Sequence, residues 1–453
     1  KMKNKRTLIY NATLVNEGKK ETGSLIIEGN TIKEILLHKE QLSNTQAYDE
    51  KIDATGLYLI PGVIDTHVHF RDPGMTQKAD FSTESAAAVA GGVTSICDMP
   101  NTIPQTTSLE ALDEKLTLMA DKSLVNYSCY FGATNSNFKL FRELENYPIC
   151  GIKLFMGAST GNMLVDRRKT LEKIFNGTNY LIATHCENND LISKNRAWYL
   201  KKENQTDDLP LNFHPLIRSE EACYQSTALA VELATQAKAR LHILHLSTAK
   251  ELSLFTKEPL ENKQITAEAC VGHLIFSDAD YSTLGTKIKC NPAIKTLSDR
   301  EALRNGVNAG LIDTIATDHA PHLLKDKEGG ALKAASGTPS IQYSLVNMLE
   351  LVDEGVFSIE TIVEKMCHAP AKIYNIAKRG FIRPGYAADL VLIKPNNQWT
   401  VTKDNILSKC GWTPFENYTY NWSIEKTFVN GKLLYNQNQV TTTHKGELLN
   451  FDL

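Results

Sequence analysis

Eight short apolar runs with β-strand character recur through the middle of the chain, and they restrict its fold more than any other feature. They occupy residues 59–66, 93–99, 125–131, 149–155, 180–185, 241–246, 265–269 and 312–317. Segments with the apolar spacing of helices lie between them, at 79–90, 109–121, 220–239 and 298–308. Eight strand-and-helix repeats over about 320 residues favour an α/β fold of the (β/α)8 TIM-barrel type over a doubly wound sheet.

Both ends of the chain are instead rich in short strands and turns. Residues 7–59 contain strand-like stretches separated by turn residues such as Gly29 and Gly56, and they are too few to bury a core alone. Residues 388–393 and 426–435 supply further strands, the latter pair joined at Asn430 and Gly431. We therefore expect 1–59 and 380–453 to form one small β-sandwich domain beside a barrel at 60–379. Two unrelated flanking β lobes are the alternative.

Charge and cysteine content exclude several classes of function. The chain has 49 Lys and Arg against 52 Asp and Glu, so it has no basic surplus for binding nucleic acid. Its apolar runs are far shorter than the ~20 residues of a membrane span, and its basic start leads into strand-like alternation rather than a signal-peptide core. Nine cysteines without C-x-x-C spacing indicate reduced thiols. We expect a cytoplasmic protein with no membrane or nucleic-acid partner.

Two histidines end the first of the eight runs. His67 and His69 are separated by one residue, and alternation along a strand places both side chains on the same side. Two imidazoles there are placed to chelate one divalent metal ion. By itself the pair is equally consistent with a polar strand end, so its interpretation depends on the remaining strands.

Further polar residues fall at or near the ends of other runs: Asn101, Lys153, His185, His245 and Asp318. The C-terminal ends of barrel strands meet at one face, so these side chains are expected to converge. Four histidines and a carboxylate suit zinc, and five ligands exceed one open tetrahedral site. A two-metal centre needs an anionic bridge, which Lys153 supplies only if it is carbamylated; a substrate-binding or ion-paired lysine is the alternative.

In order and spacing, these residues resemble the amidohydrolase superfamily and, within it, the dihydroorotase family. The stretches that carry the resemblance are His67-Val-His-Phe-Arg-Asp-Pro-Gly74, Asp98-Met-Pro-Asn-Thr102, Gly151-Ile-Lys-Leu-Phe155, Thr317-Asp-His-Ala-Pro-His322 and Trp412-Thr-Pro-Phe-Glu416. The resemblance spans nearly the whole chain. It implies two zinc ions, one held by His67, His69 and Asp318, the other by His185 and His245, with carbamylated Lys153 between them. Some members have an aspartate at the position of this lysine, whereas this chain has Gly-Ile-Lys-Leu-Phe.

The resemblance also implies an activity. It is the reversible hydrolysis of (S)-dihydroorotate to N-carbamoyl-L-aspartate in de novo pyrimidine (UMP) biosynthesis, with Asp318 as general base and then acid. Arg71, Asn101 and His322 are expected to bind the substrate carboxylate, and Asn291 the ring. Ser159 and Thr160 match a mobile loop that closes over substrate. Relatives are often homodimers, and some associate with another pyrimidine enzyme.

Two of these residues have a purely structural alternative, and the chain as a whole has alternative functions. Arg71 could form a surface ion pair with Asp72, and Asn101 could serve a turn after Pro100. Dihydropyrimidinases, hydantoinases and allantoinases share the barrel and the metal centre, but Arg71 favours a substrate with a carboxylate. A homologue that is a non-catalytic scaffold is the rival of a different class, although all six ligand positions are filled here.

Overall fold

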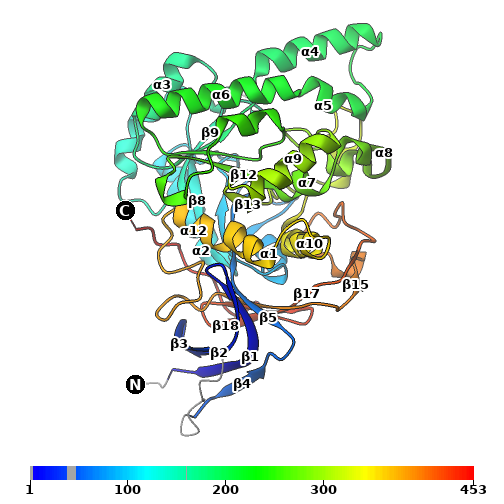
Figure 1. Cartoon of the computed structure of the whole chain (residues 1–453). Coiled ribbons are helices and arrows are strands. Elements are labelled where there is room, and N and C mark those ends of the chain that lie inside the picture. Colours follow the sequence, from blue (N-terminus) through cyan, green and yellow to red (C-terminus); the bar gives the residue numbers. More distant parts are fainter. Residues whose placement is uncertain (1–3, 38–46, 160, 453) are drawn as a thin grey trace.

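The computed structural model describes residues 4–37, 47–159 and 161–452, which form a parallel barrel and an adjoining β domain (Figure 1). The barrel sheet has eight parallel strands among the described residues. They are β6 (Val63–Val68), β7 (Val93–Asp98), β8 (Asn126–Gly132), β9 (Gly151–Phe155), β10 (Ile182–His185), β11 (Leu241–Ile243), β12 (Ile265–Cys270) and β13 (Thr314–Ala316). Each pairs with the next in the chain, and the prediction of eight strands in this order is confirmed.

The barrel closes between its first and last strands. Val68 forms a parallel bridge with His319, and the backbone N–H of His69 donates to the carbonyl oxygen of His319 over 2.7 Å. Closure places residue 69, which follows β6, beside residue 319, which follows β13. Two of the motifs singled out in the sequence are thereby brought together.

Helices connect most of the barrel strands. Asp80, Ser219 and Thr296 cap α1, α6 and α9 by accepting a backbone N–H in the first turn. The helices of the barrel segment are α1 (Phe81–Ala90), α2 (Leu109–Lys122), α3 (Arg168–Asn176), α4 (Asn189–Lys202), α5 (His214–Ile217), α6 (Glu220–Ala237), α7 (Val271–Ile275), α8 (Tyr281–Leu284), α9 (Leu297–Asn308), α10 (Ser344–Asp353), α11 (Ile359–Val363) and α12 (Ala369–Ile373). The four helices predicted from spacing correspond to α1, α2, α6 and α9.

In the part of the chain that the structure describes, two connections between barrel strands contain 3-10 turns and no α-helix. After β8 the connection contains η1 (Phe138–Leu144), and after β11 it contains η4 (Lys250–Leu254) and η5 (Leu260–Asn262). The remaining turns are η2 (Gly161–Met163), η3 (Leu211–Phe213), η6 (Asp278–Asp280), η7 (Gly285–Ile288), η8 (Leu324–Lys327), η9 (Ile341–Tyr343), η11 (Lys403–Asn405) and a π-helical turn, η10 (Glu364–His368).

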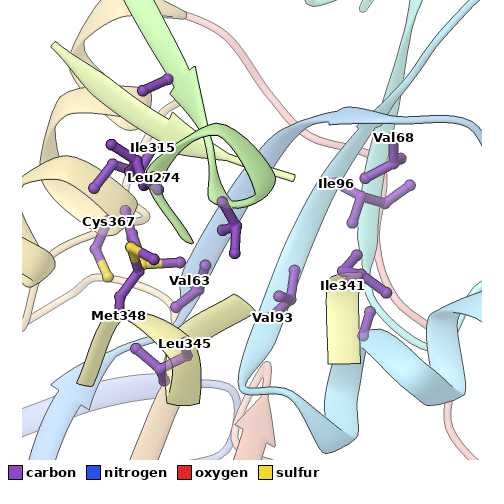
Figure 2. Close-up of a cluster of buried hydrophobic side chains, with 14 of the residues drawn as sticks. Val63, Val68, Val93, Ile96, Leu274, Ile315, Ile341, Leu345, Met348 and Cys367 are labelled. Carbon is purple, nitrogen blue, oxygen red and sulfur yellow. The ribbon is translucent and has the colours of Figure 1, made fainter. Parts of the chain in front are cut away.

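Apolar side chains pack between the barrel strands and the outer helices. Val63, Val93 and Ile315 on strands meet Leu345 and Met348 on α10 in one buried cluster (Figure 2). Removing such side chains from water is the main source of stability for the barrel.

The two chain ends build the second sheet together. Its strands are β1 (Arg6–Asn16), β2 (Lys19–Glu28), β3 (Thr31–Leu37), β4 (Glu50–Asp53), β5 (Tyr58–Pro61), β14 (Leu390–Lys394), β17 (Ser423–Val429), β18 (Lys432–Asn436) and β19 (Gln439–Val440). N-terminal β5 lies between β1 and C-terminal β14. Leu25 and Ile27 bury their side chains in one cluster with Leu390 and Phe428. The predicted β-sandwich domain from both ends is confirmed, and the alternative of two separate lobes is wrong.

The apolar run predicted as one strand at 59–66 is two strands. Leu59 and Ile60 pair with β14 in the β domain, and the barrel strand begins only at Val63. Gly62 makes the transition, where a Cβ atom would lie 2.0 Å from the hydroxyl of Thr94. Apolar character continues through both strands, so periodicity alone could not separate them.

A buried polar network joins the β domain to the barrel. Asp389, just before β14, accepts hydrogen bonds from the Arg379 side chain, from the Asn126 side chain on β8 and from the Asn430 backbone N–H. The last residues return to the barrel: Leu448 bridges Tyr127. A two-stranded antiparallel sheet of β15 (Trp399–Thr400) and β16 (Thr419–Tyr420) lies outside the sandwich sheet.

The cysteines and the lengths of the helices can be compared with what the sequence predicts. All nine cysteines are unpaired thiols, and all but Cys410 are buried. In the described ranges, no helix is both long enough and apolar enough to cross a bilayer.

Candidate metal centre and active site

One pocket of about 230 Å³ lies where the barrel strands end, and it collects residues from eight separate segments of the chain. Ten of the twelve site residues predicted from the sequence line it: His67, His69, Arg71, Asn101, Lys153, His185, His245, Asn291, Asp318 and His322. Phe155, Ala158, Ala320, Ser336 and Gly337 complete the lining. Ser159 is half-buried beside the pocket but is not among its lining residues, and Thr160 lies outside the described residues.

Among the described residues, His67, His69 and Asp318 form one group of potential metal ligands, and His67, Glu268 and Cys270 form another. The Nε2 atoms of His67 and His69 lie 3.1 and 3.0 Å from the same oxygen of Asp318, Oδ1. Each histidine uses its other ring nitrogen elsewhere: Nδ1 of His67 lies 2.7 Å from Oε1 of Glu268, and Nδ1 of His69 lies 2.8 Å from Oδ1 of Asn101. Such outer partners orient imidazoles so that Nε2 can bind a metal ion.

His185 and His245 stand on the other side of His67. Their rings meet edge to face with centroids 4.5 Å apart, and the ring of His245 is 5.3 Å from that of His67. Nε2 of His185 contacts Oε2 of Glu187 over 2.7 Å, which leaves Nδ1 as its free nitrogen. Nδ1 of His245 is buried and has no hydrogen-bond partner among the described residues. A buried, unpaired imidazole nitrogen is costly, and a bound metal ion would satisfy it.

Lys153 lies on β9 between these groups and is 1% exposed. Its Nζ atom is 4.5 Å from the centre of the Phe155 ring. Burial lowers the pKa of Lys153 to about 8, although Asp318 and Glu268 oppose this shift. The neutral amine, which is the form that reacts with carbon dioxide, is therefore more populated than in an exposed lysine. These donor types and their convergence fit a zinc centre.

Charge around Asp318 keeps its carboxylate ionised. Burial raises the pKa of Asp318, but His67 and His69 outweigh burial and hold it well below its usual range. Burial likewise lowers the pKa of His67, yet Asp318 and Glu268 raise it to about 9. Burial lowers the pKa of His69 to about 4. The ionised carboxylate of Asp318 is the form that binds a metal ion, whereas His67 holds a proton that a metal ion would displace.

Four non-glycine residues of the pocket have left-handed backbone conformations. The φ angles are 65° at Arg71, 52° at Ala158, 38° at His245 and 52° at Asp318. Such conformations are strained for residues with a Cβ atom and cluster at functional sites. Each follows a strand, where the backbone turns its side chain into the pocket.

Arg71 is a pocket residue and not a surface ion pair. It is 7% exposed, its Nε donates to the carbonyl oxygen of Pro321 over 3.0 Å, and its Nη2 lies 3.1 Å from Nε2 of His322. Asp72 binds Lys122 instead, at 2.8 Å. The alternative of an Arg71–Asp72 pair is therefore wrong, and the guanidinium is placed to bind a buried anion.

The two amides on this side also contact pocket residues. Because Oδ1 of Asn101 accepts from His69, its NH₂ group is the donor available to a ligand. Oδ1 of Asn291 accepts from the hydroxyl of Ser336 over 3.1 Å. The loop at 336–337 lines the pocket, whereas Gly330 packs against Leu209 and Asp208, away from it.

Sequence reasoning missed the carboxylates behind the ligands. Glu268 on β12 and Glu187 after β10 are fully buried and contact His67 and His185. Glu84 on α1 contacts Nε2 of His319 over 2.7 Å. The available signal was a charged residue inside an apolar run, as in Ile265-Thr-Ala-Glu-Ala-Cys270.

Two further histidines have structural roles. His273 contacts the carbonyl oxygen of Pro292 through Nε2 at 2.9 Å, and His242 contacts Thr266 through Nδ1 at 2.7 Å. Both are buried, and neither is among the residues that line the pocket.

The barrel and its convergent histidine and carboxylate donors define the class of α/β-barrel proteins with a candidate metal site at the strand ends. A model of the amidohydrolase family matches residues 58–434. The dihydroorotase of Methanosphaera stadtmanae is 33% identical over 425 residues, covering 92% of this chain and 94% of that protein. The dihydroorotase of Trichlorobacter lovleyi is 30% identical over 430 residues, covering 93% and 96%.

Solved structures extend the likeness to the whole fold. The L-hydantoinase (dihydropyrimidinase) from Arthrobacter aurescens has a TM-score of 0.90 and 26% identity, covering 97% of this chain and 98% of that one. The dihydropyrimidinase from Brevibacillus agri has a TM-score of 0.86 and 25% identity, covering 96% of each. The chain belongs to the amidohydrolase family and is therefore a hydrolase.

Proposed function

We propose that this protein is a zinc-dependent dihydroorotase, which interconverts (S)-dihydroorotate and N-carbamoyl-L-aspartate in pyrimidine (UMP) biosynthesis. The observation that carries the proposal is the buried guanidinium of Arg71 on the wall of the pocket that also holds the six metal-ligand candidates. A ring carboxylate distinguishes dihydroorotate from the uncharged cyclic amides. The names of the curated relatives agree with this choice.

The contacts of the site support the following choice of metal ligands. His67, His69 and Asp318 would hold one zinc ion, and His185 and His245 the other. Nζ of Lys153 would add to carbon dioxide and lose a proton, and the two carbamate oxygens would then link the two positions. Bound zinc would lower the pKa of a water molecule and polarise the amide carbonyl.

Asp318 would move the proton. Its Oδ1 is fixed between two imidazole nitrogens, and its low pKa keeps it available as a base. It would take a proton from the attacking water and deliver it to the ring nitrogen as the amide bond breaks. In the reverse direction the same oxygen would accept the proton of the attacking carbamoyl nitrogen.

Arg71, Asn101 and His322 would bind the ring carboxylate. Burial lowers the pKa of Arg71 to about 10, so the guanidinium remains cationic at neutral pH. Its planar fork suits two carboxylate oxygens, and Asn101 adds an N–H donor. Asn291 would face the ring, and Ser159 and Thr160 would close over it. A cytoplasmic homodimer, with or without another pyrimidine enzyme, is the proposed setting.

Hydrolysis of dihydroorotate, followed by loss of ring absorbance, tests the function in zinc-loaded protein, with dihydrouracil as the comparison substrate. We expect the parent to open dihydroorotate, and Arg71→Met to lose about a hundredfold or more in kcat/KM for it. A parent that opens dihydrouracil but not dihydroorotate would be a dihydropyrimidinase or hydantoinase, as the names of the similar solved structures suggest. A zinc-loaded parent inactive on both would contradict an enzymatic function and favour a scaffold.

A further inference from the structure

Both ring nitrogens of His322 have partners, and these partners decide which nitrogen carries the proton. Nζ of Lys78 lies 3.0 Å from Nδ1, and the carbonyl oxygen of Ser336 lies 3.0 Å from Nε2. Burial, reinforced by the charges of Arg71 and Lys78, lowers the pKa of His322 to about 2, so the ring is neutral. An ammonium group only donates hydrogen bonds, and a carbonyl oxygen only accepts them. Nδ1 therefore accepts from Lys78, and Nε2 carries the proton.

The tautomer of His322 determines whether Arg71 can donate a hydrogen bond to its ring. Nη2 of Arg71 lies 3.1 Å from Nε2 of His322. With the proton on Nδ1, Nε2 would accept a hydrogen bond from Nη2, and the Ser336 carbonyl would lose its donor. With the proton on Nε2, neither group can accept from the other. Nη2 of Arg71 then keeps its N–H donor for an anion in the pocket, while the single N–H of His322 is donated to the Ser336 carbonyl.

The surrounding backbone holds this arrangement in place. The turn that carries Arg71 also carries Lys78, through hydrogen bonds from the Met75 N–H to the Arg71 carbonyl and from the Lys78 N–H to the Met75 carbonyl. Asp326 lies 3.6 Å from the Lys78 ammonium.

The carbonyl group of Ser336 is fixed as well. Gly337 has a φ angle of 142°, and a Cβ atom there would lie 2.6 Å from the carbonyl oxygen of Ala320. Its N–H donates to the carbonyl of Lys289, and its own carbonyl accepts from Nζ of Lys327 at 2.9 Å. The acceptor for Nε2–H of His322 is therefore held on a backbone with little freedom to turn.

The geometry assigns Lys78 as a positioning residue that selects the Nε2–H tautomer of His322 and so leaves the guanidinium of Arg71 free to donate to a substrate carboxylate. This inference deepens the proposed function and rests on it for the identity of the carboxylate. It predicts that Lys78 determines specificity, since it should matter for a cyclic amide with a carboxylate and not for an uncharged one.

Steady-state kinetics of the zinc-loaded protein test the specificity. Lys78→Met should raise KM for dihydroorotate about tenfold or more, with kcat little changed, and Lys78→Arg should restore much of the loss. Lys409→Met is the matched control, because the Lys409 ammonium binds Asp80 at 2.9 Å on the same loop. The inference is overturned if Lys78→Met behaves like Lys409→Met, or if dihydrouracil turnover falls to the same extent.

The tautomer can be measured without any substrate. In protein labelled with ¹⁵N-histidine, the ring signals of His322, assigned by comparison with His322→Asn, should show a protonated Nε2 and an unprotonated Nδ1. The pattern should be lost in Lys78→Met and kept in Lys78→Arg. A protonated Nδ1 in the parent would refute the role of Lys78. A parent that shows the expected ring signals but does not hydrolyse dihydroorotate would refute only the proposed substrate.

Discussion

Oε1 of Glu268 lies 2.7 Å from Nδ1 of His67, and the same oxygen accepts the backbone N–H of His245 over 3.1 Å. One buried carboxylate thus positions a candidate ligand from each of the two metal positions. Burial raises the pKa of Glu268, but the neighbouring His67 and His242 lower it far more, so the group stays ionised. Through these two contacts Glu268 supports the metal centre.

Glu268→Gln should weaken zinc binding roughly ten- to a hundredfold, because the amide is a poorer partner for the His67 ring than the carboxylate. Competition with a chromogenic chelator measures the affinity. Glu251→Gln is the control, since Glu251 is also buried but binds Thr227 and Thr248 instead. Equal zinc affinities in the two variants would contradict the assigned role.

Lys153→Met should bind one zinc ion per chain where the parent binds two, because the anionic link between the two positions is lost. Protein equilibrated with ¹³C-bicarbonate should give a carbamate carbon signal in the parent and not in the variant. Elemental analysis gives the zinc content. A parent with two zinc ions and no carbamate signal would show that Lys153 acts in another way.

Acid should destabilise the protein partly through Glu187. Burial raises its pKa, but Arg218 at 2.6 Å and His185 at 2.7 Å lower it from an ordinary 4.5 to about 2. A carboxyl group with a depressed folded-state pKa contributes stability above its unfolded pKa and loses it as the pH falls. The loss should amount to about 3 kcal/mol between pH 4.5 and 2.

Urea unfolding of metal-free protein at several pH values measures this loss. Glu187→Gln should be less stable than the parent at neutral pH, and the gap should close as the pH falls through that interval. A gap independent of pH would mean that Glu187 stays ionised throughout or contributes only by packing.

Asp389→Asn should reduce the free energy of unfolding by an amount on the order of 3 kcal/mol, because it removes the buried one of the two carboxylates that pair with the guanidinium of Arg379. Glu447 contacts the same arginine but is 53% exposed, so Glu447→Gln should cost about 1 kcal/mol or less. Denaturant melts of both variants test the difference. Similar losses would mean that the network does not depend on the burial of Asp389.

Much of the fold was predictable because strand ends and turns leave strong local signals. The eight runs, the His67-x-His69 pair and Asp318 could be placed at one barrel face from order and spacing alone. The break at Gly62 could not be placed, because both strands that it separates are apolar and only their neighbours differ.

The charged residues that contact the site histidines from behind could not be predicted from the sequence. Glu268 and Lys78 resemble many other charged residues until the fold brings each within 3.0 Å of a histidine more than 200 positions away. Motif matching finds residues that touch metal or substrate. Motif matching does not find the residues that orient these side chains, because only the tertiary structure brings an orienting residue next to its partner.

Strands from both chain ends pair in one sheet, so this sheet can be completed only late in synthesis. β5 cannot gain its neighbour β14 until residues 390–394 have been synthesised, more than 300 positions later. Until then Leu25, Ile27 and Leu59 lack the C-terminal side chains that cover them, and the edge of β5 has no strand on that side. Until residues 390–394 have been made, these apolar side chains and this strand edge therefore favour aggregation.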